Sequence, residues 1–314
     1  MKLAPIGMSV YTRIDHFRRC VEALKLNTLA GESDFYIYSD AAGKQEDEQL
    51  VREVREYAHS ISGFKSVTVT ERETNYGGIK NSWLAWNEVV GKGEGGMSIY
   101  LEDDILTAPG FLAFMNQALN FYRDDENITA VTGYSPNINV PADYEDDVFA
   151  LTARGEGWGS GTFDRTVEAA SQRIDKQEFE SLDRVVLDRF GDDLLYMVEL
   201  EARGELNAGD VRLSYYQATH NKYMVYPRKS LVQNIGLDGS GVHCGSSSKH
   251  DHDQLWDKID GFTFVKGINP DARIVAECKE LSRVSRGTKI AYMLRSKAPV
   301  LYSLVNGIKG VFTK

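Results

Sequence analysis

The stretch Met97-Ser98-Ile99-Tyr100-Leu101-Glu102-Asp103-Asp104 gives the clearest indication of the fold. It is an apolar run of strand length, preceded by Gly95-Gly96, that ends abruptly in three consecutive carboxylates. Buried parallel strands have such continuous apolar runs, and open α/β sheets bind ligands beyond the carboxyl ends of their strands. The stretch therefore predicts a central strand with an acidic ligand site at its end.

The three acids at this strand end repel one another and lose hydration, so a positive partner is expected to compensate them. A hard divalent cation, Mg²⁺ or Mn²⁺, is the simplest candidate. Such ions are held by one or two carboxylates and by the oxygens of a phosphorylated substrate. The alternative is an acidic turn that ends the strand in water, since acidic turns are common. The local pattern leaves both interpretations open.

The composition is that of an ordinary globular protein. Of the 314 residues, 42% are hydrophobic and 26% are charged, which suits one large α/β domain or two smaller ones. A net charge of −10 without a basic stripe over most of the chain argues against nucleic-acid binding. We find neither a transmembrane stretch nor the apolar core of a secretory signal. The widely spaced Cys20, Cys244 and Cys278 indicate free thiols in a reducing cytoplasm.

Strand-like and helix-like patterns alternate along the first 135 residues. The strand-like segments are 5–13, 35–38, 67–69 and 97–101, and helical apolar spacing follows each of them at 17–24, 50–61, 79–90 and 111–121. Such alternation predicts a parallel, right-handed, doubly wound sheet. No G-x-G-x-x-G follows the first strand, which disfavours a dinucleotide-binding Rossmann domain. We expect the loop ends at Arg13, Asp40 and Lys80 to lie at the same sheet edge as the three acids.

Two glycine-rich segments follow. Residues 154–161 hold four glycines around Trp158, too many for the interior of a helix or strand. They indicate a loop whose backbone approaches a ligand beside the flat indole; the alternative is a tryptophan that plugs the core under a turn. Residues 234–243 form a second such loop, ending at His243. The spacing of His243, Cys244, His250 and His252 matches no structural zinc pattern.

The remaining segments predict helices and a basic tail. Residues 162–206 look helical, and Asp210 begins a further helix, either as a functional carboxylate or as a simple N-cap. The last stretch, 289–314, mixes apolar and basic residues and contains no acid. In an acidic protein this reversal suits a segment that meets anionic lipid headgroups. The alternative is a helix docked on the core or on a second subunit.

With its flanking loops, Leu101-Glu102-Asp103-Asp104-Ile105 resembles inverting glycosyltransferases of the GT-A fold over roughly residues 5–245. The resemblance is strongest to bacterial family-2-type enzymes related to the eukaryotic N-acetylglucosaminyltransferase that initiates complex N-glycans. Gly157-Trp158-Gly159 and the segment from Tyr226-Pro227 to Val242-His243 match in the expected order. Asp210-Val211-Arg212 fits the family's aspartate followed by arginine, although the usual aromatic residues around the aspartate are replaced by Val211 and Leu213.

This resemblance implies a role for each matched residue. Asp104 would bind the metal, Mn²⁺ or Mg²⁺, that bridges the diphosphate, and Asp210 would be the general base. The remaining matched residues would bind the donor: Asp103 and Glu102 on the sugar and ribose side, Tyr11, Thr12 and Arg13 at the nucleotide, Asp40 at the uracil, Lys80 or Arg13 at the diphosphate, and Trp158 and His243 along the pocket.

The implied activity is metal-dependent, inverting transfer of a sugar from a nucleotide-diphosphate donor, foremost a UDP-sugar, to a hydroxyl of a glycan or lipid-linked glycan. A nucleotidyltransferase of related fold is one alternative, but residues 9–15 lack a glycine- and basic-rich triphosphate loop. A non-catalytic nucleotide-sugar or glycan-binding module is another, which the intact acids disfavour. A metal-dependent hydrolase is disfavoured because no binuclear-type His/Asp set accompanies the triplet.

The same resemblance sets the expected domain organisation. We expect a GT-A type α/β domain over residues 1–275, with a nucleotide-binding part over 1–135 and an acceptor-binding part over 136–275. A basic, amphipathic, helical extension would follow over 276–314. The expected location is the cytoplasm, with peripheral contact to the inner face of the membrane through 289–314 during polysaccharide biosynthesis.

Overall fold

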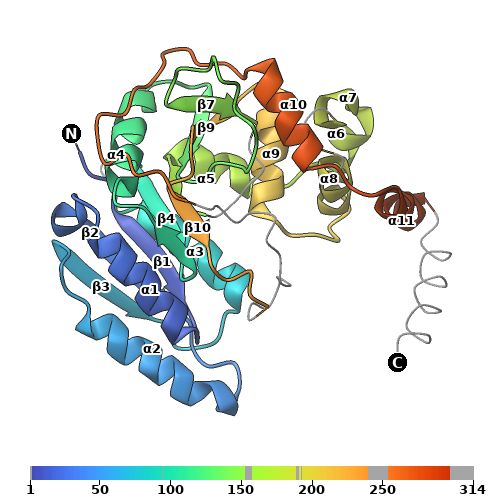
Figure 1. Cartoon of the computed structure of the whole chain (residues 1–314). Coiled ribbons are helices and arrows are strands. Elements are labelled where there is room, and N and C mark those ends of the chain that lie inside the picture. The colour runs from blue at the N-terminus through green and yellow to red at the C-terminus, as the bar shows by residue number, and fades with distance from the viewer. Residues whose placement is uncertain are drawn as a thin grey trace.

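A computed structural model describes residues 2–93, 95–152, 158–188, 191, 193–239 and 254–297. Its first half alternates strands and helices as the sequence predicts (Figure 1). The elements are β1 (Ile6–Val10), α1 (Ile14–Lys25), β2 (Asp34–Ser39), α2 (Glu48–Ser60), β3 (Ser66–Glu71), α3 (Gly78–Val90), β4 (Ser98–Glu102), β5 (Ile105–Thr107), α4 (Phe111–Tyr122) and β6 (Ile128–Thr132), with short 3₁₀ turns at Ala30–Glu32 and Gln45–Asp47.

The second half adds short strands and a group of helices. They are β7 (Val148–Leu151), β8 (Ser160–Thr162), α5 (Asp164–Ser171), α6 (Lys176–Ser181), α7 (Val185–Asp188), α8 (Leu194–Ala202), α9 (Gly209–His220), β9 (Tyr223–Pro227), β10 (Val232–Asn234), α10 (Ala272–Leu281) and α11 (Arg286–Lys297). None of the helices in the described ranges is long and apolar enough to cross a membrane.

An eight-stranded, mostly parallel sheet forms the centre of the protein, in the order β3-β2-β1-β4-β8-β6-β9-β7. The first four strands in this order are parallel to one another, and β9 is parallel to β6. Strand β8 runs antiparallel to both neighbours, as does β7 to β9. The predicted α/β class is therefore confirmed, and the carboxyl ends of β1, β2 and β4 meet at one edge.

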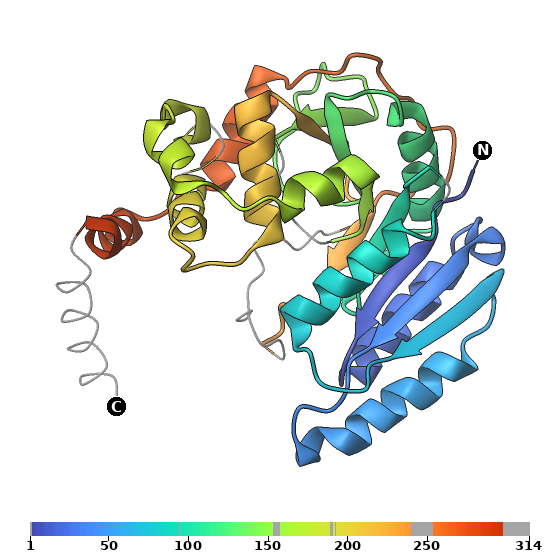
Figure 2. The same cartoon turned by 180° about the vertical axis from the view of Figure 1, so that it is seen from behind.

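Helices cover both faces of the parallel half. Ile6, Met8 and Val10 of β1 pack in one core with α1 and α4, while the intervening Gly7 and Ser9 face the other side. There α3 covers the sheet, as Figure 2 shows from behind. A Cβ on Gly7 would lie 2.8 Å from Val89 Cγ1, so the absent side chain lets α3 lie close to β1. This close packing brings the start of α3 to the acidic edge.

A second hydrophobic core holds the helices that follow the sheet. It joins side chains of α6, α7, α8 and α9 around residues that are each less than one-tenth exposed: Ile174, Phe179, Leu187, Leu194, Val198, Val211, Tyr215 and Ala218. The prediction of a helical region over 162–206 is met by α5 to α8. Through this core, the position of α9 depends on residues far from the sheet edge.

The strands β5, β7, β8 and β10 were not predicted, and β8 differs from the expected loop. Gly161 lies inside this strand, between β4 and β6, although glycine usually weakens a strand. A Cβ on Gly161 would lie 2.8 Å from Met115 Cε, so glycine lets α4 pack directly on the sheet.

Candidate active site

The predicted acidic site forms where β4 ends. Asp103 and Asp104 occupy the turn between β4 and β5, and their side chains are only 7% and 9% exposed. Strand β10 pairs antiparallel with β5, and the Ile235 N–H donates to the Asp104 carbonyl at 2.9 Å. These backbone bonds fix the turn, because the chain is held on both sides of the two carboxylates.

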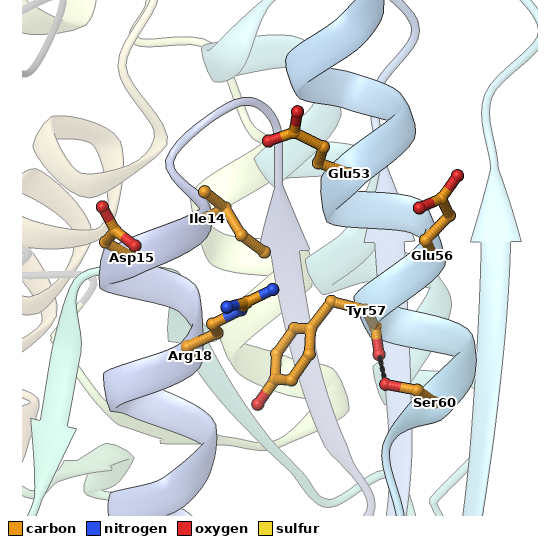
Figure 3. A pocket seen from close by; sticks show the side chains of 7 residues that line it. All are labelled: Ile14, Asp15, Arg18, Glu53, Glu56, Tyr57 and Ser60. Carbon is orange, nitrogen blue, oxygen red and sulfur yellow. Dashed lines mark hydrogen bonds between the residues drawn. The ribbon is translucent and has the colours of Figure 1, made fainter.

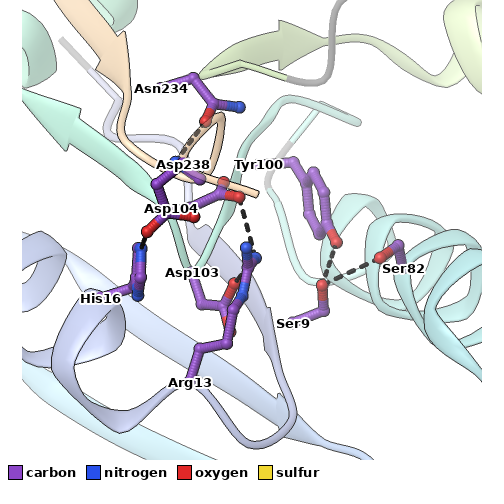
Figure 4. Close-up of polar contacts among 10 residues, drawn as sticks. Ser9, Arg13, His16, Ser82, Tyr100, Asp103, Asp104, Asn234 and Asp238 are labelled. Atoms are coloured by element: carbon purple, nitrogen blue, oxygen red, sulfur yellow. Dashed lines mark hydrogen bonds and ion pairs between the residues drawn. The ribbon is translucent and has the colours of Figure 1, made fainter. Parts of the chain in front are cut away.

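Arg13 is the positive partner of both acids. It is the N-cap residue of α1, at the end of the short loop after β1. Its Nη2 donates to Asp103 Oδ1 and lies 2.8 Å from Asp104 Oδ2 (Figure 4). Because β1 is the parallel neighbour of β4, the loops after these strands meet at one edge. The expected compensation of the acids is therefore provided, within the described residues, by a guanidinium.

One oxygen of Asp104 has no partner among the described residues. Asp104 Oδ1 is buried and accepts no hydrogen bond from the part of the chain that the structure describes, whereas Oδ2 pairs with Arg13. The segment after β10 closes over the carboxylate, since a Cβ on Gly236 would collide with Asp104 Oδ2. The Gly236 N–H donates to Asn234 Oδ1 at 2.7 Å, which holds this close approach. Glycine is thus required beside Asp104.

The chemistry of this edge suits a hard divalent cation. A buried carboxylate oxygen without a partner is the ligand that Mg²⁺ or Mn²⁺ prefers, and Asp103 offers a second carboxylate beside it. Among the described residues, no three or more His, Cys, Asp or Glu side chains form a metal cage. The residues therefore fit an ion that takes one or two protein ligands and shares the rest with a substrate.

The acidic edge strongly perturbs the titration of its members. Burial, followed by the charges of Asp104 and Asp103, raises the pKa of Glu102 to about 8. Burial also raises the pKa of Asp103 to about 6, although Arg13 opposes the rise. The charge of Asp210 also raises the pKa of Glu102. Asp210 therefore acts electrostatically on the same edge, although it belongs to α9. Perturbed carboxyl groups gathered in this way are typical of functional sites.

Asp210 lies in the first turn of α9, where the sequence predicts it. The N-cap residue of that helix is Ala208, so Asp210 is not the N-cap. Its side chain keeps contact with solvent, while the protein packed around it raises the pKa of its carboxyl by desolvation. The arrangement leaves a solvent-accessible carboxylate whose charge reaches Glu102.

Four contacts hold the start of α9 in place. A Cβ on Gly209 would lie 2.7 Å from the Trp83 ring of α3, so the helix begins directly against the indole. Arg212 Nε donates to the Ala170 carbonyl at 2.6 Å, and its Nη1 donates to Glu201 Oε1 at 2.8 Å. The buried Glu201 also accepts from the Ala208 N–H at 3.1 Å. This network fixes the residues on both sides of Asp210.

Asp40 holds the loop before α3. Buried after β2, it accepts hydrogen bonds from the N–H groups of Tyr76 and Gly77, both at 2.9 Å, and from Asn75 Nδ2 at 3.3 Å. Lys80 is exposed in the first turn of α3, with its Nζ 4.4 Å from the centre of the Tyr76 ring. The loop at residues 75–77 thus connects Asp40 with the first turn of α3, where Lys80 lies. This connection does not pass through the acids at 102–104.

The other predicted residues are placed as follows. Tyr11 donates to Asp47 Oδ2 at 2.7 Å and accepts from the Gly43 N–H, while the Thr12 carbonyl accepts from the Ile14 N–H at the start of α1. Trp158 is half-buried, with its ring edge-on to Tyr134 at 5.0 Å. Gly157, His243, the candidate zinc tract and residues 298–314 lie outside the described residues.

Several residues of the site were missed in the sequence. Glu201 and Trp83 lie in helices whose patterns resemble those of other helices, so nothing distinguished them. Asn234 and Gly236 belong to the glycine-rich segment, where attention fell on His243 at its far end. His16 Nε2 lies 3.2 Å from Asp238 Oδ2 and joins α1 to that segment. The high glycine content of residues 234–243 was the one signal in the sequence that could have drawn attention to Asn234 and Gly236.

A separate pocket of about 580 Å³ opens between α1 and α2 (Figure 3). It contains none of the predicted site residues, and its lining is formed by Ile14, Asp15, Arg18, Glu53, Glu56, Tyr57 and Ser60. The Arg18 guanidinium lies 5.2 Å from the centre of the Tyr57 ring, across this pocket. The candidate active site is therefore the acidic edge and not this groove.

No protein-family model matches the chain, and none of the curated proteins matches it. Among solved structures, it is similar to the mannosyltransferase PcManGT from Pyrobaculum calidifontis in complex with GDP-Man and Mn²⁺, with a TM-score of 0.35 and 14% identity over 54% of this chain and 47% of that chain. It is also similar to S. aureus TarS, with a TM-score of 0.38 and 13% identity over 74% of this chain and 36% of that chain.

A third similar structure is S. aureus TarS 1–349 in complex with UDP, with a TM-score of 0.36 and 13% identity over 74% of this chain and 60% of that chain. The chain spans less than two thirds of the length of each of these three structures. Likenesses this distant do not assign an activity to the chain. The site geometry and the sequence motifs therefore carry the functional argument.

The raised pKa of Glu102 predicts a pH-dependent stability in metal-free buffer. Between pH about 4.5 and about 8 the folded state holds a proton that the unfolded state has released, so stability falls as the pH rises. Glu102→Gln removes this titration, and we expect the variant to exceed the wild type in unfolding free energy by about 1–2 kcal/mol at pH 8. Urea unfolding at several pH values measures this. If the unfolding free energies of the variant and the wild type changed with pH in parallel, this prediction would be contradicted. The control is Glu46→Gln, which changes an exposed carboxylate.

The buried ion pair at α9 makes a second prediction. Glu201→Gln keeps the shape of the side chain but leaves the Arg212 guanidinium, only 7% exposed, without its counter-charge. We expect a loss of about 3 kcal/mol in unfolding free energy, because an unpaired buried charge is strongly destabilising. The control is Glu205→Gln, whose 44% exposed carboxylate should change stability by less than ~0.5 kcal/mol. Equal urea midpoints for the two variants would refute the role of the pair.

Proposed function

We propose that this protein is a metal-dependent glycosyltransferase that moves a sugar from a nucleotide-diphosphate donor to a hydroxyl of an acceptor, with inversion at the anomeric carbon. One observation carries the proposal. Asp104 is buried at the carboxyl end of β4 with one oxygen that has no partner within the described ranges, and Asp210 acts electrostatically on the same edge from helix α9. A cation-binding carboxylate and a separate, accessible carboxylate are the two groups that such a displacement needs.

On the donor side, Asp104 would hold Mn²⁺ or Mg²⁺, with Asp103 beside it. The bound ion would neutralise the negative charge that grows on the leaving diphosphate. Arg13 already lies between the two acids, so its guanidinium is close enough to add a positive charge to the same phosphates. Glu102, which precedes them on β4, would line the sugar side.

The nucleotide would lie over the loops after β1 and β2. Tyr11 and Thr12 belong to the first of these loops, and Asp40 follows β2. Both Asp40 oxygens accept hydrogen bonds from the loop at 75–77. Asp40 would therefore shape the pocket for the nucleobase as well as contact the nucleobase itself. Lys80 would reach the diphosphate, and Trp158 and His243 would complete the pocket wall.

Asp210 would act as the general base that accepts the proton of the attacking hydroxyl. A base works best when its pKa approaches the working pH, and desolvation raises the pKa of Asp210 in that direction. An inverting displacement needs one base and no enzyme nucleophile. Water and acceptor can reach this carboxylate, because its side chain remains open to solvent.

The finer assignments follow from the sequence resemblance. We favour a UDP-sugar as donor, with a hexosyl or N-acetylhexosaminyl group, and a glycan or lipid-linked glycan as acceptor. A cytoplasmic place in polysaccharide biosynthesis accords with such an acceptor. These assignments are separable from the central proposal, because a donor with another nucleobase or another sugar would use the same acids.

The proposal is tested by Asp210→Asn. Loss of the base should lower turnover by about 10²- to 10⁴-fold while leaving metal-dependent nucleotide binding intact. Turnover is measured as nucleoside diphosphate released from a panel of UDP- and GDP-sugars, with simple glycosides or water as acceptor. The control is Asp124→Asn, which changes an exposed carboxylate just after α4.

Two results would contradict this role. Unchanged turnover in Asp210→Asn would show that another group takes the proton. Loss of nucleotide binding together with turnover would show that Asp210 is structural. Nucleotide binding without turnover in the wild type, over a broad acceptor panel, would favour a non-catalytic binding module.

A further inference from the structure

Helix α11 lies at the margin of the protein, beside the helices of the second core (Figure 1). Its inner face contacts α8 and the residues after it. The Tyr292 ring stacks on Tyr196 with 3.8 Å between ring centres, and Arg295 Nη2 lies 3.7 Å from Glu205 Oε2. These contacts set which face of α11 points away from the protein.

The outer face of α11 consists of Arg286, Lys289, Ile290 and Met293, all of them exposed. Their spacing of three, four and seven residues places them along one stripe of the helix. Ile290 is 54% exposed and Met293 is 51% exposed, which is high for large apolar side chains of a folded helix. The stripe therefore combines two cations with two apolar side chains.

The charge of this region is opposite to that of the protein. From residue 281 to the end, the sequence contains no acid, while its basic residues are Arg283, Arg286, Lys289, Arg295, Lys297, Lys309 and Lys314. The chain as a whole carries a net charge of −10. An anionic surface would thus attract this region and repel most of the remaining protein, which would orient the molecule.

We propose that the outer face of α11 docks the protein on an anionic lipid surface. Arg286 and Lys289 would contact headgroup phosphates, and Ile290 and Met293 would enter the interface below them. A second copy of the chain fits less well, because a symmetric interface would place the same basic stripe against itself. The inference rests on α11 and on the basic sequence around it, and it holds whether or not the protein transfers sugars.

The full chain is tested by sedimentation with vesicles of phosphatidylcholine, with or without phosphatidylglycerol. We expect binding only to the anionic vesicles, weakening as salt is added. The double variant Arg286→Gln with Lys289→Gln should bind at least about fivefold more weakly, because each cation near the surface contributes to attraction. Ile290→Ser with Met293→Ser should also weaken binding, since it removes the apolar contacts.

Matched controls change the same chemistry elsewhere. Lys44→Gln with Lys65→Gln removes two exposed cations from the first half of the chain, and Leu26→Ser with Val185→Ser removes two apolar side chains that are each 70% exposed. Both controls should bind anionic vesicles as the wild type does. Circular dichroism and the thermal midpoint verify that the α11 variants remain folded.

Three outcomes would overturn the proposal. They are failure of the wild type to bind anionic vesicles, equal binding to neutral and anionic vesicles, and unchanged binding by both α11 variants. Sedimentation velocity without lipid measures the oligomeric state and so tests the alternative that this face binds a second copy of the chain. A dimer that the α11 variants dissociate, together with absence of vesicle binding, would assign this face to a second copy of the chain.

Discussion

The burial of two carboxylates against one guanidinium is the constraint on which the candidate site depends. Asp103 and Asp104 are held in the turn after β4, where Arg13 faces both. Among the described residues these two buried acids pair with one cation, which leaves an excess of negative charge, and burial raises the pKa of Asp103 and Glu102. A fold that was selected for stability alone would gain nothing from this excess. It is explained if the site completes its charge balance with a cation and a phosphorylated ligand.

The second carboxylate belongs to a different layer of the protein. Asp210 begins α9, whose apolar side packs in the core of the helices after the sheet. Gly209 against Trp83, and Arg212 between Ala170 and Glu201, tie that core to α3 and α5. The distance between Asp104 and Asp210 is therefore set by packing between two cores. Such packing gives a rigid separation, which the displacement proposed above would require.

Much of the sheet could be predicted, because long elements with regular apolar spacing determine the first half of the chain. The shared position of Arg13 and the acids at 102–104 could also be predicted, since carboxyl ends of parallel strands meet at one edge. Short strands such as β8 were missed, because three residues with a central glycine carry no periodic signal. Glu201 and Trp83 were missed for another reason. Their roles arise from contacts between distant helices, which local patterns do not contain.

Calorimetric titration of UDP, GDP and CDP, each with and without Mn²⁺, tests the central claim most directly. The titration compares the wild type with Asp104→Ala, and urea unfolding verifies that the variant is folded. The account predicts that one nucleotide binds the wild type only in the presence of the ion and that this binding is lost in the variant. Binding of that nucleotide to Asp104→Ala with undiminished metal dependence, or no binding of any nucleotide to the wild type, would contradict it.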